Sequence, residues 1–334
     1  MKIAIDAMGG DYGLDVVIPA IAHIRKKKEY DHVCLVLVGD KKQITDKLAK
    51  YELKLDNNLF IEHASEVVEM YDQPAKALRN KKDSSMRLAL NLVKNKLADA
   101  CVSAGNTGAL VLTAKFVLNT LPGVDRAAIL AAFPTEKGFV NVLDLGANIS
   151  SSSDNLYQFA VLGNTLTKYV HNIENPKVAL LNIGSESIKG TDTIKDAAEL
   201  IKTNPNINYT GFVEGSDIFK GKVDVIVCDG FTGNIALKTS EGLYRFFANS
   251  IKKQFTSSLY GKIIAVLCYP LIKRFKKHID PKEYNGAMII GLNGIVVKSH
   301  GGADIVSFAN AIQHTIKSVQ TDVLKKLRDN FESE

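Results

Sequence analysis

Five short segments combine glycine with small polar side chains in a pattern suited to binding an anion. They are 6–11, 103–108, 144–148, 182–185 and 229–234. Glycine lets backbone N–H groups converge on one anion, and a helix that starts directly afterwards adds a partial positive charge. In any single segment, a glycine that only makes a tight turn is the simpler explanation. Together the five favour a phosphate-binding crevice formed by Gly9, Gly10, Asp11, Ser103, Gly105, Thr107, Asn148, Asn182, Gly184, Gly230, Thr232 and Gly233.

Two lysines and one histidine lie beside such segments. Lys189 follows the 182–185 segment, and Lys298 and His300 belong to the sequence Lys298-Ser-His-Gly301. A lysine near a glycine turn can pair with phosphate as a point charge, although a surface lysine is usually only solvated. His300 can be a general acid or base, a neutral hydrogen-bond donor or a helix cap. All three are candidate catalytic residues, with these alternatives open.

Motifs of several other protein classes are missing. There is no G-x-G-x-x-G after a strand, no G-x-x-x-x-G-K-[ST], no G-x-S-x-G and no H-E-x-x-H, which counts against dehydrogenases, P-loop ATPases, serine hydrolases and zinc proteases. The four cysteines fit neither a zinc site nor a disulfide framework. Tryptophan is absent, which argues against an aromatic platform for nucleic acid. We expect no cofactor, no metal and no nucleic-acid partner.

The elements that would position these residues are short apolar strands alternating with helices. The strand candidates are 2–8, 34–39, 59–64, 100–105, 126–133, 140–146, 178–184, 223–229 and 288–299. This alternation is typical of a mostly parallel sheet with helices on both faces, a three-layer α/β/α, Rossmann-like fold. We expect the polar segments to collect along one carboxyl edge of the sheet. The absence of a linker predicts a single domain over residues 1–334.

Polar residues mark several helix starts. Ser84 or Ser85 precedes 86–96, Thr107 precedes 110–118 and Asp154 precedes 156–170. Apolar residues then repeat from Ile305 to Leu327 over about six turns. This final stretch is predicted to be one long packing helix, which could also form a dimer seam.

The net charge of +6 comes from one local patch. Residues 252–277 hold seven basic side chains and no acid, so the other 308 residues sum to −1. Within the patch, 263–272 is an uncharged and largely apolar run that is too short to span a bilayer. We predict that it binds an anionic membrane surface as an interfacial helix or hairpin, the alternative being packing in the core or at a dimer interface. The basic residues are Lys252, Lys253, Lys262, Lys273, Arg274, Lys276 and Lys277.

The N-terminal residues 1–7 resemble neither a secretory nor a transit peptide, since they already contain Asp6. We therefore expect a cytoplasmic protein that is peripherally associated with the inner face of the cell membrane.

Four segments, in order along the chain, resemble the bacterial phosphate acyltransferase family, PlsX. They are Met1-Lys-Ile-Ala-Ile-Asp-Ala-Met-Gly-Gly-Asp11, Val102-Ser-Ala-Gly-Asn-Thr-Gly-Ala-Leu110, Cys228-Asp-Gly-Phe-Thr-Gly-Asn234 and Gly291-Leu-Asn-Gly-Ile-Val-Val-Lys-Ser-His-Gly301. The resemblance implies conversion of acyl-acyl carrier protein and inorganic phosphate into acyl phosphate and free carrier protein, for phospholipid synthesis. It also implies a homodimer with a fold like that of the isocitrate and isopropylmalate dehydrogenases, without their nicotinamide chemistry.

The chain departs from the family pattern at two places. After 144–148 the family usually has an acid and then a basic residue, whereas this chain has Ile149 followed by four serines. Ser185 stands where the family often has an acid. Both departures count against an essential acid at these positions.

Attack of phosphate on a thioester needs little covalent help, because thiolate is a fair leaving group and phosphate is already a nucleophile at neutral pH. The protein must hold phosphate against the carbonyl and stabilise the oxyanion. We assign phosphate binding to Lys189, Lys298 and the turn amides. Asn106 or Asn234 would donate to the oxyanion, and Asp229 could orient them.

Two other functions stay open on the residues alone. A nicotinamide- and metal-dependent dehydrogenase of related fold would need a dinucleotide fingerprint and clustered aspartates, but Asp6, Asp11, Asp144 and Asp229 lie on separate turns. A non-catalytic membrane-associated scaffold would use the glycine turns only structurally. Turnover of phosphate separates these functions from acyl transfer.

Overall fold

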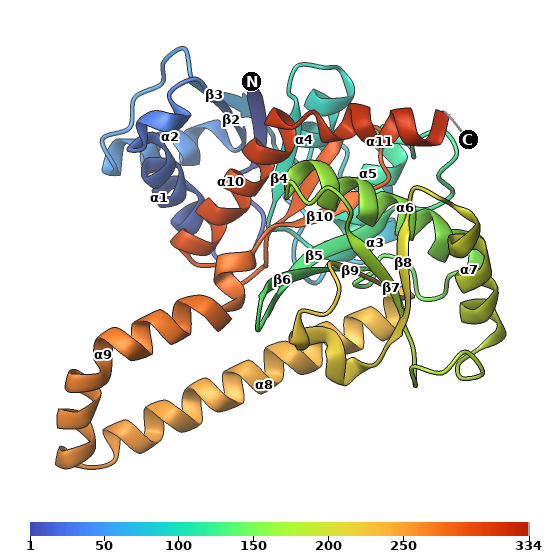
Figure 1. Cartoon of the computed structure of the whole chain (residues 1–334). Helices are drawn as coiled ribbons and strands as arrows, with labels where there is room; N and C mark the ends of the chain where they lie inside the picture. The colour runs from blue at the N-terminus through green and yellow to red at the C-terminus, as the bar shows by residue number, and fades with distance from the viewer. Residues whose placement is uncertain (333–334) are drawn as a thin grey trace.

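The computed structural model describes residues 1–332, without the side chains at 276–278, 281 and 332. Its strands form one eleven-stranded sheet in the order β3-β2-β1-β4-β11-β10-β5-β6-β9-β7-β8 (Figure 1). The strands are β1 (Lys2–Asp6), β2 (Cys34–Gly39), β3 (Leu59–His63), β4 (Ala100–Ser103), β5 (Ala128–Thr135), β6 (Gly138–Leu143), β7 (Lys177–Leu181), β8 (Asn208–Val213), β9 (Val225–Val227), β10 (Ala287–Ile290) and β11 (Ile295–Lys298).

The two halves of the sheet run in opposite directions. Strands β1 to β4, β11 and β5 are aligned one way, and β10, β6, β9, β7 and β8 the other, because the central pairs β11–β10, β10–β5 and β5–β6 are antiparallel. The expectation that all five polar segments share one carboxyl edge is therefore wrong. Segments 6–11 and 103–108 leave the sheet in one direction, and segments 144–148, 182–185 and 229–234 leave it in the other.

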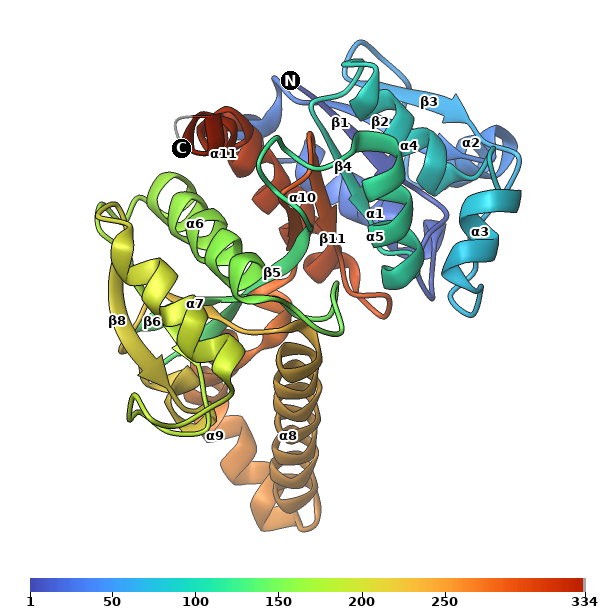
Figure 2. The ribbon, with the colours of Figure 1, turned by 90° about the vertical axis from the view of Figure 1, so that its right-hand side faces the viewer.

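Helices cover both faces of the sheet, which confirms the three-layer α/β/α architecture (Figure 2). One core layer includes side chains from α1 (Leu14–Arg25), α2 (Lys41–Lys50), α6 (Ser153–Val170), α7 (Asp192–Thr203), α10 (Ile305–Gln320) and α11 (Val323–Glu332). The other includes α3 (Pro74–Asn80), α4 (Ser85–Lys94) and α5 (Thr107–Leu118). Short 3-10 helices lie at η1 (Lys28–Tyr30), η2 (Gly215–Lys220) and η3 (Pro281–Tyr284).

Helix caps follow side-chain chemistry, with small shifts from the predicted positions. Ser84 caps α4 as expected, by accepting from the backbone N–H of Arg87. The cap of α6 is Ser152 in a capping box with Asn155, and not Asp154. The serine hydroxyl bonds the N3 amide while the N3 side chain returns to the cap, so two orphan amides are satisfied at once.

Two predicted elements are each divided in the structure. The run 288–299 forms β10 and β11, which pair antiparallel around a turn in which Gly291 has a φ of +90°. The C-terminal stretch breaks between Thr321 and Asp322 into α10 and α11, and Asp322 has positive φ. The prediction of one long helix is therefore wrong. Much of α10 is buried in the chain's own core, and a dimer seam along this stretch stays a prediction.

Two long helices extend away from the body of the protein, α8 (Gly230–Thr256) and α9 (Leu259–Ile279) (Figure 1). They contain the basic and apolar segment predicted from the sequence, although the side chains of Lys276 and Lys277 lie outside the described residues. No single helix within residues 1–332 is long and apolar enough to cross a membrane. As a pair bent by 119°, α8 and 259–275 meet the length and composition requirement.

Candidate active site

Three turns interlock at the ends of β1, β4 and β11. The buried Asp6 accepts hydrogen bonds from the hydroxyls of Ser85 and Ser103, both at 2.6 Å. A Cβ on Gly9 would lie 2.5 Å from the Asp6 carboxylate. The N–H of Asp11 donates to the carbonyl of Gly301 at 3.0 Å. The glycines at this corner therefore serve close packing of three turns, and burial raises the pKa of Asp6.

Lys298 ends β11 at this corner and is only 7% exposed. Its ammonium group donates to the carbonyl oxygens of Ala104, at 3.2 Å, and of Ser299. An ammonium has three N–H donors, so one remains for a ligand. Burial lowers the pKa of Lys298 to about 8, with Asp6 and Asp11 opposing the shift.

His300 is held by two hydrogen bonds of the backbone. Its own N–H donates to Oδ1 of Asn285 at 3.0 Å, and its Nδ1 accepts from the N–H of Gly302 at 3.0 Å. Because Nδ1 is an acceptor, the neutral ring carries its proton on Nε2. Partial burial lowers the pKa of His300 and outweighs the opposite effect of Glu241. The geometry therefore favours a neutral donor among the three roles left open.

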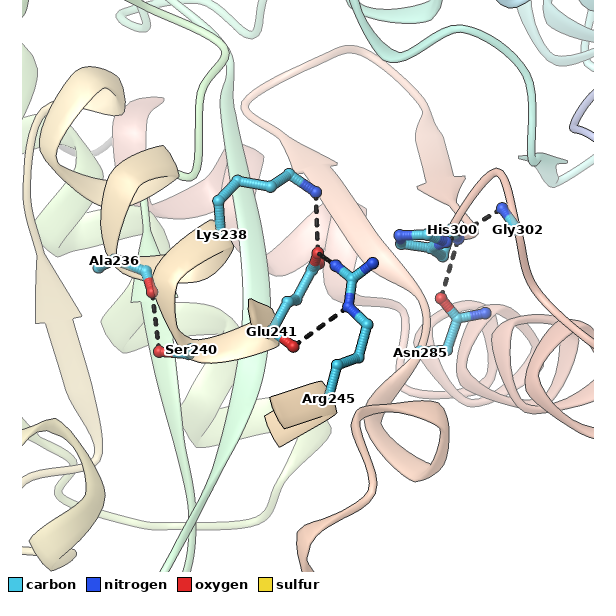
Figure 3. Close-up of polar contacts among 8 residues, drawn as sticks. All are labelled: Ala236, Lys238, Ser240, Glu241, Arg245, Asn285, His300 and Gly302. Carbon is cyan, nitrogen blue, oxygen red and sulfur yellow. Dashed lines mark hydrogen bonds and ion pairs between the residues drawn. The ribbon is translucent and has the colours of Figure 1, made fainter. Parts of the chain in front are cut away.

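Helix α8 turns a charged face toward this corner (Figure 3). The carboxylate of Glu241 accepts from Lys238 at 3.0 Å and from Arg245 at 3.2 Å. The Glu241 side chain is 14% exposed, whereas those of Lys238 and Arg245 are 55% and 66% exposed. One acid thus holds two accessible cations facing the His300 segment.

The start of α8 packs against the loop that follows β6. Asp144 shapes this loop by accepting from the N–H groups of Ala147, at 2.9 Å, and Asn148, at 2.8 Å. Gly230 and Gly233 lie so close to this loop that a Cβ would collide with the carbonyls of Asn148 and Asp144. The two glycines allow the close approach.

Asn234 lies beside the same loop, near Gly146. Its amide has no hydrogen-bond partner among residues 1–332, and the residue is exposed. It therefore offers two free N–H donors. Asn148, by contrast, uses its amide on the carbonyl of Ala127 and on Asp144.

The loop after β7 is closed by Asn182. Its Nδ2 donates to the carbonyl of Lys189 at 3.1 Å, and its Oδ1 accepts from the N–H of Ile183 at 2.9 Å. Gly190 fits against Asn182 with a φ of +91°. Gly184 lies under the side chains of Glu186 and Lys189. Lys189 itself is exposed, and no hydrogen bond or ion pair of its side chain is found within residues 1–332.

Two predicted polar residues have structural roles instead. Asn106 caps α5 through Oδ1, and both of its amide hydrogens donate to carbonyls, of Met70 at 2.8 Å and of Asp72 at 3.1 Å. No amide hydrogen of Asn106 is left for an oxyanion. Asp229 caps α8 and accepts from both the N–H and the hydroxyl of Thr232. The predicted cap of α5, Thr107, is instead the first residue of that helix, because Asn106 caps it by accepting from the N–H of Ala109.

Two of the predicted phosphate ligands at the β4 turn, Ser103 and Gly105, already form hydrogen bonds within the protein. The hydroxyl of Ser103 donates to Asp6 and accepts from the N–H of Gly105 at 3.0 Å. Thr107 is exposed at the start of α5, whose first backbone N–H groups have no partner inside the helix. Gly10 adopts a φ of +93° against Ala104 and Gly301.

Helix α8 brings the two halves of the site together. It starts beside the 144–148 loop, and Lys238, one turn after Asn234, already lowers the pKa of Lys298. Although the sheet halves point in opposite directions, α8 runs from the loop beside Asn234 toward Lys298 and His300, and the charge of Lys238 acts on both of these residues. Lys189 makes no hydrogen bond or ion pair with Lys298 or His300 within residues 1–332, and it lies on the loop that follows β7.

The sequence interpretation missed Asn285, Lys238, Glu241 and Arg245. Asn285 also donates to the hydroxyl of Ser299, at 2.8 Å, and to the carbonyl of Ser307. Asn285 lies fifteen residues before His300 and belongs to none of the sequence motifs. In the sequence, Lys238, Glu241 and Arg245 look like ordinary surface charges. Only the structure shows that α8 places them opposite His300.

No group of three or more His, Cys, Asp or Glu residues within the described chain could hold a metal ion. Cys34, Cys101 and Cys228 are buried free thiols and Cys268 is half-buried. Burial raises the pKa of Cys101 and of Cys228, which makes these thiols poor nucleophiles.

Solved structures share the fold. The phosphotransacetylase from Streptococcus pyogenes has a TM-score of 0.63 at 18% identity, covering 96% of this chain and 94% of that chain. A putative 4-hydroxythreonine-4-phosphate dehydrogenase from Salmonella typhimurium has a TM-score of 0.56 at 14% identity, covering 95% and 98%. At such identities the likeness concerns the fold alone, and it agrees with the predicted Rossmann-like, dehydrogenase-type architecture.

Relatives found by sequence share far more identical residues with this chain than these solved structures do. A family model described as fatty acid synthesis protein matches residues 1–326. The phosphate acyltransferase of Methylococcus capsulatus is 54% identical over 329 residues, 98% of this chain and 96% of the relative. That of Nitrosococcus oceani is 50% identical over 332 residues, 99% and 97% of the two chains. The resemblance carried by the four sequence segments is thus confirmed over nearly the whole length, and the chain belongs to the phosphate acyltransferase family of fatty acid synthesis proteins.

Proposed function

We propose that this protein transfers a fatty acyl group from acyl-acyl carrier protein to inorganic phosphate and so supplies acyl phosphate for phospholipid synthesis. A phosphate oxygen attacks the thioester carbonyl, the carbon–sulfur bond breaks, and the carrier leaves as its thiolate, which then takes up a proton. The observation that carries this function is that α8 presents a free amide donor, Asn234, one turn before Lys238, whose charge acts on the cationic corner of Lys298 and His300.

Phosphate would bind at the cationic corner. The third N–H of Lys298 and the Nε2–H of His300 are both unspent donors in this geometry. Charge-assisted hydrogen bonds from such groups are about twice as strong as neutral ones. Lys238 and Arg245 add accessible positive charge beside them. Lys189, across α8, would hold the phosphate from the β7 side.

The oxyanion would be stabilised by Asn234. Its free amide stands at the first turns of α8, where the helix dipole also favours negative charge. Asn106 has no amide hydrogen to give, so Asn234 takes the role that the sequence left shared between them. His300 donates rather than accepts, and phosphate needs no general base in this scheme.

The proposed reaction is tested by incubating the purified protein with an acyl-acyl carrier protein, with and without phosphate, and trapping acyl phosphate with hydroxylamine. We expect thioester cleavage to require phosphate and to yield the hydroxamate. Equal cleavage without phosphate would identify a hydrolase and reject the proposal.

We propose further that α8 and α9 dock the protein on the inner face of the cell membrane from the cytoplasm. Along these helices large apolar side chains are left uncovered, including Val266 and Leu267, each 75% exposed, and Leu271, 68% exposed. Lys262, Lys273 and Arg274 flank them. Basic residues near an anionic leaflet contribute about 1 kcal/mol each.

The same helices would support a homodimer. Leu243, Phe247 and Ile251 are 52%, 53% and 43% exposed, and their spacing of four residues places them on one side of α8. A second copy of the chain covering this side would remove apolar surface from water. Light scattering of the purified protein would give twice the monomer mass.

A further inference from the structure

Four large apolar side chains stand out into solvent beside the candidate active site. Ile149 is 85% exposed, Ile183 81%, Ile188 80% and Phe231 61%. Single exposed apolar residues are ordinary on protein surfaces, but a group of them marks a binding surface. We refer to these four residues as the apolar collar.

The collar follows three strands that are neighbours in the sheet. Ile149 lies beyond β6, Phe231 beyond β9, and Ile183 and Ile188 beyond β7, and these three strands are parallel in the order β6-β9-β7. Adjacent strands are spaced by about 5 Å, so the three strand ends lie within roughly 10 Å. The three loops that carry the four side chains therefore leave the sheet side by side.

The loops that present the collar are fixed by internal hydrogen bonds. Asp144 holds the loop before Ile149 through three backbone N–H groups, of Gly146, Ala147 and Asn148. Asn182 holds both ends of the loop that contains Ile183 and Ile188. The exposure of these side chains thus comes from loops that are anchored rather than from unsupported chain ends.

The collar is continuous with the proposed oxyanion donor. Phe231 precedes Asn234 by three residues on α8, and Gly146, beside Asn234, belongs to the loop that leads to Ile149. The cations Lys238 and Arg245 follow Asn234 on the other side, toward His300. Lys238 and Arg245 therefore lie on the side of Asn234 away from the collar, while Lys189, next to Ile188, is the one cation proposed to bind phosphate on the loops that present the collar.

We propose that the apolar collar binds the hydrocarbon chain of the acyl substrate. This inference rests on the proposed function, which places the thioester carbonyl at Asn234. A chain that leaves this carbonyl has the charged corner on one side and the collar on the other, and only the collar lowers the free energy of hydrocarbon in water. The product, an acyl phosphate, has the same division into a charged head and an apolar tail.

The collar predicts a dependence of rate on chain length. Each methylene that leaves water on the collar should raise kcat/KM by about two- to fourfold, the upper value being that of full burial. Donors from butanoyl to hexadecanoyl should therefore show a steep rise that levels off once the chain extends past the collar.

The test compares the parent with a double variant, Ile183→Asn and Ile188→Asn, across acyl-carrier donors of increasing length. Both positions are exposed on a loop whose hydrogen bonds use the backbone and Asn182, so folding is retained. Leu55→Asn is the matched control, since Leu55 is 49% exposed and precedes β3 at the far edge of the sheet. The reverse control, Ile188→Leu, keeps the apolar surface.

We expect the double variant to match the parent with the butanoyl donor and to lose about tenfold or more with the hexadecanoyl donor, while both controls keep the parent profile. A double variant whose profile runs parallel to that of the parent would overturn the inference. A second readout separates this inference from the proposed reaction: competition of palmitic acid with a fluorescent fatty acid, which needs no turnover. Weaker binding by the double variant alone supports the collar even if no acyl phosphate forms, and equal binding by all variants rejects it.

Discussion

The backbone N–H of Gly302 donates to Nδ1 of His300 at 3.0 Å, and this single bond fixes which ring nitrogen carries the proton. A proton added at Nδ1 would break the bond and set two donors against each other. His300 can therefore give a hydrogen bond from Nε2 but is poorly placed to remove a proton from phosphate.

This relationship predicts the outcome of three substitutions. The amide nitrogen of glutamine can stand where Nε2 stands, so His300→Gln should keep most of the activity. His300→Ala and the shorter His300→Asn remove that donor and should lose on the order of a hundredfold in kcat/KM for phosphate. Steady-state kinetics decide the point. If His300→Gln is as slow as His300→Ala, and the parent loses activity below the ordinary histidine pKa, the histidine acts as a base.

Lys298 predicts an alkaline limit of activity. Its pKa is lowered by burial to about 8, so the ammonium is charged below that pH and activity should fall as pH rises through it. Asp11→Asn removes a charge that raises this pKa and should move the limit to lower pH. Lys238→Gln removes a charge that lowers it and should move the limit to higher pH. The measurement is the pH profile of kcat/KM for phosphate. If the two variants shift the profile in the same direction, or not at all, Lys298 is not the group that sets the alkaline limit.

Membrane docking by α8 and α9 predicts sedimentation of the protein with anionic vesicles and much less with neutral ones. Leu267→Glu introduces a charge at an exposed apolar position and should release the protein. Replacement of Lys273, Arg274, Lys276 and Lys277 by Ser should weaken binding to anionic vesicles by removing attractions of about 1 kcal/mol each. Leu55→Glu, far from these helices, serves as control. If parent and variants all remain in the supernatant, the helices are ordinary packing elements.

A pair of enclosed histidines predicts acid-sensitive stability. His171 and His314, with ring centroids 6.4 Å apart, line a cavity of about 180 Å³. Burial lowers the pKa of His171 to about 3 and that of His314 to about 4, from an ordinary 6.5. Between pH 6.5 and the lowered pKa values, the unfolded chain therefore binds more protons than the folded chain. The free energy of unfolding should then fall as pH decreases below 6.5, by about 1 kcal/mol per pH unit for each histidine.

Urea unfolding near neutral pH and near pH 5 measures this loss. His314→Leu should reduce the difference between the two conditions by about 1–2 kcal/mol, whereas the exposed His23→Gln should leave it unchanged. A His314→Leu protein with the same acid loss as the parent would contradict the assignment.

The strand pattern allowed the layers and most strands to be predicted, and the four family-like segments proposed Asn234, Lys298 and His300 as site residues, which stays a prediction. The direction of the strands did not follow from the sequence, because apolar runs look alike in either orientation. The inversion at β10, β5 and β6 divided the polar segments into two groups. Only α8 links the two groups, since it starts against the 144–148 loop and carries Lys238 toward Lys298 and His300.

Local hydrogen bonding also decided what the sequence left open. Asn106 and Asn234 stand in similar turns, yet the neighbouring carbonyls of Met70 and Asp72 use both donors of Asn106. Those carbonyls come from a segment more than thirty residues away, so no reading of the turn itself could separate the two asparagines. Asn285 was missed for the same reason, since its partners are distant in sequence.

The central claim is that phosphate is the acyl acceptor at the site on α8, and labelled phosphate tests it most directly. The parent, Asn234→Ala and Lys189→Ala are each given a hexadecanoyl-acyl carrier protein in phosphate labelled with oxygen-18 at all positions, and products are read by mass spectrometry. We predict acyl phosphate that retains every labelled oxygen from the parent, formed on the order of a hundredfold more slowly by both folded variants. Free fatty acid without labelled acyl phosphate, or near-parent rates in both variants, would contradict the account.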